Sequence, residues 1–241
     1  MNNTRLTKIF IGATVLAAIS GIVYASMQRQ TLHAWYGLAV LALAAATSRM
    51  KVKLPGIEGN MSVNLPFLLT AVVTLSAVEA VAVAALSTVV QCWPKQGGKF
   101  KAEQMLFNVS MMSVAASLAN VVWNAGWSNS TLASQPPMLA AATATFFFGQ
   151  TVPVAAIIKL TQGESMRKVW ISIAQLSFPY FVLSAGVTAM FDLVSHSFGW
   201  QAAVVIFPVM YGVHRSYRLY FARFAEAVQA PALARAASAN A

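Results

Sequence analysis

Long apolar runs follow one another along most of this 241-residue chain, separated by short charged segments. A transmembrane helix needs about 20 mainly apolar residues, with a range of about 17 to 25. Each run approaches or exceeds that length, except the second, which is shorter. The runs bounded by charges and turn residues are 9–27, 34–48, 104–125, 138–160, 169–194 and 199–217.

The composition indicates the same class of protein. Hydrophobic residues make up 58% of the chain and charged residues 9%, whereas about a quarter of the residues in a soluble domain are charged. No stretch has enough polar surface to solvate a separate domain. We therefore expect an all-α integral membrane protein, with one polytopic membrane domain at residues 1–220 and a short basic, Ala-rich cytoplasmic tail at 221–241.

The apolar run at residues 63–93 is too long for one ordinary crossing. As a straight helix its 31 residues would be about 46 Å long, against a hydrocarbon core of about 30 Å. Lys and Arg favour the cytoplasmic side of a membrane, and both flanks of this run are basic. The flanking residues are Arg49, Lys51, Lys53, Lys95, Lys99 and Lys101. The run should therefore enter and return as a hairpin of two short helices that bends near residues 74–77.

This hairpin makes the remaining charges consistent with one topology. The sequence predicts six transmembrane helices plus the membrane hairpin, up to eight crossings, with both termini in the cytoplasm. Fifteen of the sixteen Lys and Arg residues then fall on the cytoplasmic side, and only Arg29 does not. The expected location is a bacterial inner membrane, which the chain crosses several times.

The net charge of +10 would suit a nucleic-acid-binding protein if it formed a patch on a soluble face. Here the charges are scattered at helix ends, so we expect them to set the topology and to attract anionic lipid, with no nucleic-acid partner. The single cysteine, Cys92, excludes an internal disulfide and a cysteine-rich metal site. Catalytic, phosphate-binding and zinc motifs are absent, so the sequence predicts no catalytic residue, metal or cofactor.

Two acids stand within or near the apolar runs. Glu79 follows the expected bend, where it either caps the second arm of the hairpin, because acids are favoured at helix N-termini, or serves a function inside the membrane. Asp192 and His196 are four residues apart and would share a helix face at the outer end of the 169–194 span. We assign all three as candidate ligand-binding residues, with a hydrogen-bonded pair as the simpler role of the last two.

Three amides complete the candidate ligand-binding set. Asn64 stands where a helix cap is expected, with Pro66 in the first turn, and the preceding segment could form a lip over a ligand. Asn108 and Asn120 lie among small residues, where amides join neighbouring helices. For these two, the alternative to joining helices is to line a cavity for a small ligand.

Short motifs resemble a known family. The chain carries "LPG" at residues 54–56, "SVN" at 62–64 and "LFN" at 106–108, around the long apolar hairpin and a basic loop. This pattern resembles the N-terminal multi-span membrane region that precedes HD-GYP phosphodiesterase or GGDEF cyclase domains in bacteria, over residues 35–220. The family often has Gly-Pro at the bend, where this chain has Ser76 and Ala77, and no output domain follows in this sequence.

The resemblance implies a non-catalytic sensor-like module of the bacterial inner membrane. Such a module would bind a lipidic or small-molecule ligand and act through a membrane or cytoplasmic partner protein. One alternative is a transport subunit that resembles the substrate-capture component of an energy-coupling-factor importer, for which the small residues of "IGATVLAAISG" would suit docking. A second alternative is an intramembrane enzyme that uses Glu79.

The hairpin predicts that positions 55 and 97 lie on the same side of the membrane. In a chain without Cys92, single cysteines at these two positions should both react with an impermeant reagent only after the cytoplasmic side is opened to it. A cysteine at 97 that reacts from outside, while one at 55 does not, would contradict the hairpin.

Overall fold

The structure is a computed structural model that describes residues 3–28, 30–53, 60–94, 100–125 and 135–198, together with seven isolated positions between residues 208 and 219. Apart from those seven positions, the predicted span at 199–217 and the predicted tail at 221–241 lie outside the described residues. The side chains of residues 194–198 are also outside the description, although their backbone belongs to a helix.

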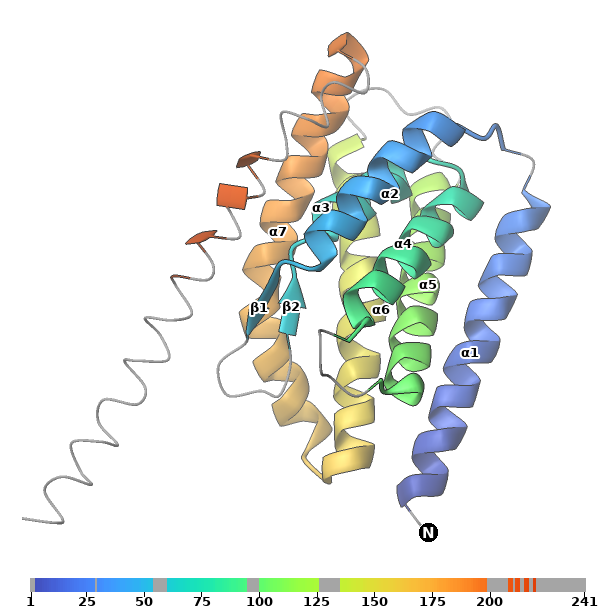
Figure 1. Cartoon of the computed structure of the whole chain (residues 1–241), viewed down its shortest axis with the longest axis vertical. Coiled ribbons are helices and arrows are strands. Elements are labelled where there is room, and N and C mark those ends of the chain that lie inside the picture. The colour runs from blue at the N-terminus through green and yellow to red at the C-terminus, as the bar shows by residue number, and fades with distance from the viewer. Residues whose placement is uncertain are drawn as a thin grey trace, which may run out of the picture.

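Helices make up nearly all of the described chain, which confirms the predicted helical class (Figure 1). Four of them, α1, α5, α6 and α7, are long and apolar enough to cross a membrane, whereas α2, α3 and α4 are shorter apolar helices. The helix bounds are α1 (Asn3–Met27), α2 (Ala34–Ser48), α3 (Leu65–Thr74), α4 (Ala77–Cys92), α5 (Ala102–Asn124), α6 (Gln135–Gln162) and α7 (Met166–Phe198).

The structure contains a small β-hairpin that the all-α prediction did not include. Strand β1 (Lys51–Lys53) pairs antiparallel with β2 (Asn60–Ser62), and Val52 lies opposite Met61. From the sequence, this segment is predicted only as the basic flank of the next apolar run and as a lip over a ligand. Its strands are three residues each, too short to give a periodic signal. The Ser62 hydroxyl donates to the Ser48 carbonyl at 2.9 Å, which fastens the hairpin to the end of α2.

The apolar run at 63–93 breaks into two helices, as predicted, and the break falls at the expected place. Helix α3 ends at Thr74 and α4 begins at Ala77, while Leu75 and Ser76 are extended. At 1.5 Å per residue, the 10 residues of α3 and the 16 of α4 are about 15 and 24 Å long. Neither arm alone matches a hydrocarbon core of about 30 Å.

Successive helices alternate in direction. The first turns of α1 and α5 and the α6–α7 connection lie at one end of the bundle, whereas the α1–α2 connection and the last turn of α7 lie at the other (Figure 1). Exposed basic side chains gather at the first of these, which we call the basic end. They are Arg5, Lys8, Lys101, Lys159, Arg167 and Lys168.

Helix α3 is the centre of the packing. Every residue from Leu65 to Val72 is buried, because α2, α4, α5 and α7 all contact this helix. A helix that is apolar on all sides lies either in the core of a protein or against lipid, and α3 lies in the core. Helix α3 therefore lies in the interior of the bundle, between two short helices, α2 and α4, and two long ones, α5 and α7.

Small residues bring the long helices close together. In α1, Ala18 and Ala25 are buried, and a Cβ on Gly21 would lie 3.1 Å from the Ser117 hydroxyl of α5. Part of the "IGATVLAAISG" pattern is thus used for packing within the chain, although Gly12 remains exposed. Between α5 and α6, a Cβ on Gly149 would lie 3.1 Å from the Ala115 Cα and Cβ.

The Gly149 contact predicts a specific sensitivity to size. Gly149→Leu should force α5 and α6 apart and cost about 1–3 kcal/mol, which lowers Tm by about 2–4 °C for each kcal/mol. Thermal unfolding in detergent measures this. The matched control is Gly12→Leu, since nothing lies within 4 Å of a Cβ there. Equal Tm values for the two variants would show that the close approach does not stabilise the fold.

Candidate functional site

Glu79 closes the bend between α3 and α4 by a reciprocal cap. Its Oε2 accepts hydrogen bonds from the Ser76 backbone N–H at 3.1 Å and from the Ser76 hydroxyl at 2.7 Å. The Ser76 Oγ in turn accepts from the Glu79 N–H at 3.3 Å. This arrangement is a capping box, whose sequence signature is Ser followed three residues later by Glu. It satisfies N–H groups that the first turn of α4 leaves without helical partners.

The same bend holds the α1–α2 connection. The second carboxylate oxygen of Glu79, Oε1, accepts from the His33 backbone N–H at 2.8 Å. In the opposite direction, the Ala77 N–H donates to the Gln30 side-chain oxygen at 2.6 Å. Both oxygens of Glu79 are therefore engaged within the chain, which favours the capping role over a catalytic one.

Asn120 joins α5 to the other side of the break. Its Nδ2 donates to the Val72 carbonyl at 2.9 Å, and its side chain is only 1% exposed. Val72 lies in the last turn of α3, where carbonyls lack helical partners, and the Ser76 N–H that would serve it in a continuous helix is bonded to Glu79 instead. Asn120 thus satisfies a carbonyl that the bend leaves open.

The other two amides lie elsewhere. Asn108 donates to the Cys92 sulfur at 3.4 Å and so joins the start of α5 to the end of α4. It is twelve residues from Asn120, about 18 Å along the helix. Asn64 occupies the N-cap position of α3 and is buried, yet its side chain makes no capping bond and its Nδ2 has no partner among the described residues. Asn64 therefore stands at the predicted N-cap position, but its side chain does not make the hydrogen bond expected of a cap.

Asp192 lines a cavity in the described part of the chain. His196 belongs to α7, but its side chain lies outside the described part of the chain, so the predicted pairing of the two is untested. The five candidate residues whose side chains are described do not form one site. Asn108 lies far along α5 from Asn120, and the bonds of Glu79 are confined to the bend and the α1–α2 connection.

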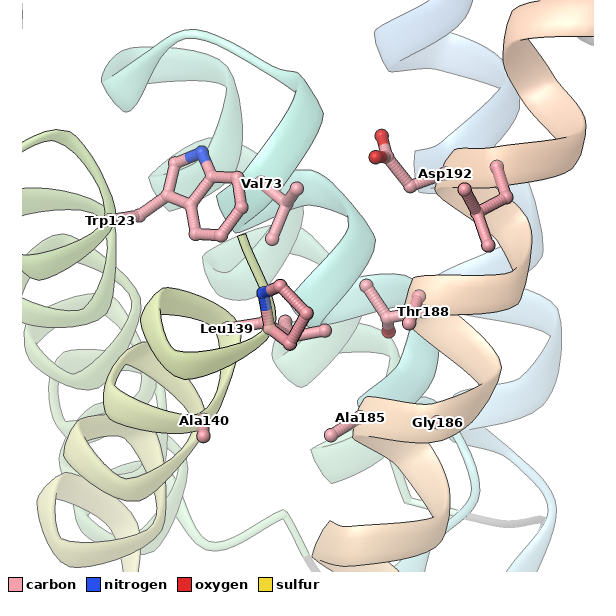
Figure 2. A pocket seen from close by; sticks show the side chains of 11 residues that line it. Val73, Trp123, Leu139, Ala140, Ala185, Gly186, Thr188 and Asp192 are labelled. Atoms are coloured by element: carbon pink, nitrogen blue, oxygen red, sulfur yellow. The ribbon is translucent and has the colours of Figure 1, made fainter. Parts of the chain in front are cut away.

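The cavity has a volume of about 460 Å³ and lies between α3, α5, α6 and α7 (Figure 2). Its lining comes from the last turns of α3 and α5, the start of α6 and the second half of α7, which lie toward the end opposite the basic residues. Its lining is almost entirely apolar and includes Val73 of α3, Trp123 of α5 and Leu139 of α6. Thr188 also lines it, but donates its hydroxyl to the Pro66 carbonyl at 3.2 Å. Ligand pockets typically have volumes of about 300–1,000 Å³ and mainly apolar walls, so this cavity is of a suitable size and kind.

The cavity arises from an uneven distribution of side-chain size along α6 and α7. Toward the basic end, aromatic rings fill the space between them, as where Phe147 meets Phe181 edge to face at 5.0 Å. In the other half, the walls are made by small residues, Ala140 on α6 with Ala185, Gly186 and Ala189 on α7 (Figure 2). The sequence shows this change, although it does not show that these particular segments face each other.

The wall formed by α7 is held against α2 by aromatic packing. The rings of Tyr36 and Phe191 stack with centroids 6.3 Å apart. The Tyr36 hydroxyl lies near Thr74 and within electrostatic range of Asp192. Thr74 donates its own hydroxyl to the Thr70 carbonyl at 2.7 Å, and no contact of the buried Tyr36 hydroxyl with a described residue meets hydrogen-bond geometry. Thr74 is therefore a neighbour of the Tyr36 hydroxyl, and its own hydrogen bond goes to the Thr70 carbonyl of α3.

Within the described ranges, no three side chains of His, Cys, Asp or Glu lie close enough together to hold a metal ion. Comparisons with protein-family models, curated proteins and solved structures found no match for this chain. The resemblance to membrane regions that precede HD-GYP or GGDEF domains therefore stays a prediction.

The bonds of Glu79 predict graded losses of stability. Removing a helix cap costs about 0.5–2 kcal/mol, and Glu79→Ala should fall in the upper part of that range because the His33 bond is lost as well. Glu79→Gln keeps one acceptor oxygen and should lose less. Denaturant or thermal unfolding measures both. The control is Glu103→Ala, which removes an exposed acid from the first turn of α5; equal effects at 79 and 103 would argue against the cap.

Proposed function

We propose that this protein is a non-catalytic membrane module that binds a small apolar or lipid-like ligand in the cavity between α6 and α7. The observation that carries this proposal is the cavity itself, about 460 Å³ with an almost wholly apolar lining. An apolar space that opens between two helices of crossing length is accessible to molecules dissolved in the bilayer.

The orientation that we propose follows from the basic end. Clustered Lys and Arg favour the cytoplasm, so the first turns of α1 and α5 and the α6–α7 connection lie on the cytoplasmic side of a bacterial inner membrane. The cavity then belongs to the outer half of the bilayer. We retain six spans plus the membrane hairpin, with the residues at 199–217 as the last span and both termini in the cytoplasm.

Entry from the side of the bundle suits the exposure of the cavity walls. Ala140 on α6 and Gly186 on α7 line the cavity and are both exposed, whereas Leu139 and Thr188 lie deeper and are buried. A ligand would therefore pass from the lipid between the two helices and stop against α3. Because Val73 of α3 is part of the lining, a ligand in the cavity would contact α3, a helix buried in the interior of the bundle.

Binding without transport is favoured by the packing beyond the cavity. Toward the basic end, Phe146 and Phe147 are buried, and both rings meet Phe181 of α7. These side chains fill the space through which a ligand would have to continue to the cytoplasm. A sensor-like role, in which a partner protein responds to occupancy, needs no such passage.

A substitution that fills the cavity tests this function. Gly186→Leu should place a side chain in the lining, since nothing lies within 4 Å of a Cβ at that position. Native mass spectrometry of protein extracted from its membrane should show a bound small molecule that the variant retains about tenfold less well, which corresponds to about 1.4 kcal/mol. Ala140→Leu fills the same cavity from the facing helix and should act in the same direction.

The matched control is Gly12→Leu, which adds the same side chain at an exposed and equally open site on α1. It should retain the ligand like the unaltered protein. Equal retention by all three variants would contradict binding in this cavity.

A further inference from the structure

The mouth of the cavity has two side chains of unusual chemistry for an apolar site. Trp123 of α5 and Asp192 of α7 lie on opposite sides of it, with Val73 of α3 between and behind them (Figure 2). Both are partly exposed. The rest of the lining is apolar, apart from the Thr188 hydroxyl, which is engaged by α3. Any polar selectivity of the cavity therefore comes from the indole and the carboxylate.

A carboxylate at the edge of an apolar membrane site favours one sign of ligand charge. Ionisable residues within a bilayer are rare, and they mark binding sites and ion pathways by default. No Lys or Arg of the described chain lines this cavity. An anionic head group placed here would face the Asp192 charge, whereas a cationic one would be attracted by it.

The indole adds a second preference for cations. The face of a tryptophan ring attracts an ammonium group through its quadrupole, and tryptophan is the best of the aromatic side chains for this purpose. An ammonium group held between Trp123 and Asp192 would be attracted by both. Its apolar chain would extend past Val73 and Leu139 toward Ala185, along the part of the lining that has no charge.

We propose that the ligand of this cavity is an amphiphile with an ammonium head group, whose head lies between Trp123 and Asp192 and whose apolar chain lies between α6 and α7. This inference rests on the proposed function and names the class of ligand. Two sources share this chemistry, a phospholipid with an ethanolamine head group and a free alkylammonium compound.

Binding to the purified chain in digitonin tests the head-group preference. The probes are dodecyltrimethylammonium and 1-dodecanol, which share a chain length and differ in charge. Asp192→Asn should weaken binding of the ammonium probe about tenfold, and Trp123→Leu about threefold, the scale of a partly exposed cation–π contact. Neither variant should change binding of dodecanol by more than about twofold, a difference of about 0.4 kcal/mol. Isothermal titration calorimetry measures each affinity.

Glu164→Gln is the matched control, because it removes one negative charge from an exposed position in the α6–α7 connection at the basic end. If Glu164→Gln weakens binding of the ammonium probe as much as Asp192→Asn does, the net charge of the protein explains the effect and the proposed ligand class is wrong. The ligand class is also wrong if the unaltered protein binds dodecanol as tightly as the ammonium probe.

Gly186→Leu separates this inference from the proposed function. If it weakens both probes while Asp192→Asn changes neither, the cavity binds ligands but does not select ammonium groups. If it changes the binding of neither probe, the cavity is not the binding site and both proposals fail. This result is expected if another segment of the chain fills the cavity.

Native mass spectrometry from nanodiscs of phosphatidylethanolamine and phosphatidylglycerol with equal chains distinguishes the two sources. Selective retention of the ethanolamine lipid, lost in Asp192→Asn, supports the lipid. Tight binding of the alkylammonium probe without such retention supports the free compound.

Discussion

Backbone polar groups inside a bilayer must find partners within the protein, and this chain breaks an apolar run beside the α1–α2 connection, at one end of its bundle. The break at Leu75 and Ser76 leaves carbonyls at the end of α3 and N–H groups at the start of α4 without helical partners. Glu79 satisfies one side of the break and Asn120 the other. At the far end of α4, the Arg49 guanidinium donates to the Val90 carbonyl at 3.2 Å. These side chains make two short helices possible where one long helix would not fit.

The remaining architecture follows from that break. Helix α3, only 10 residues long, is buried, and α2, α4, α5 and α7 pack around it. Small residues keep α5 close to α1 and α6, and aromatic rings fill the α6–α7 interface toward the basic end. Beyond those rings the side chains become small, and the space left between α6, α7 and the end of α3 is the cavity. A binding module for apolar ligands is the function that this geometry supports best.

The features predictable from the sequence are those with local causes. The helical class follows from apolar runs, and the bend follows from a run too long for the bilayer, with Ser76 and Glu79 at capping-box spacing. The alternation of helix direction follows from the basic residues. The contact of Glu79 with His33 could not be predicted from the sequence, because it joins residues 46 positions apart in the chain. The cavity could not be predicted, because it depends on which faces of α6 and α7 meet. Nothing in the residues around Trp123 indicates that its side chain lines the cavity. Only Asp192 marked the cavity in the sequence.

A cryo-EM map of the unaltered protein in lipid nanodiscs, at a resolution that shows side chains, tests the account most directly. The account predicts α3 and α4 separated at residues 75–76, with elongated non-protein density between α6 and α7 that ends beside Trp123 and Asp192. A continuous helix through 75–76, or α6 and α7 closed against each other with no space between Ala140 and Ala185, would contradict it.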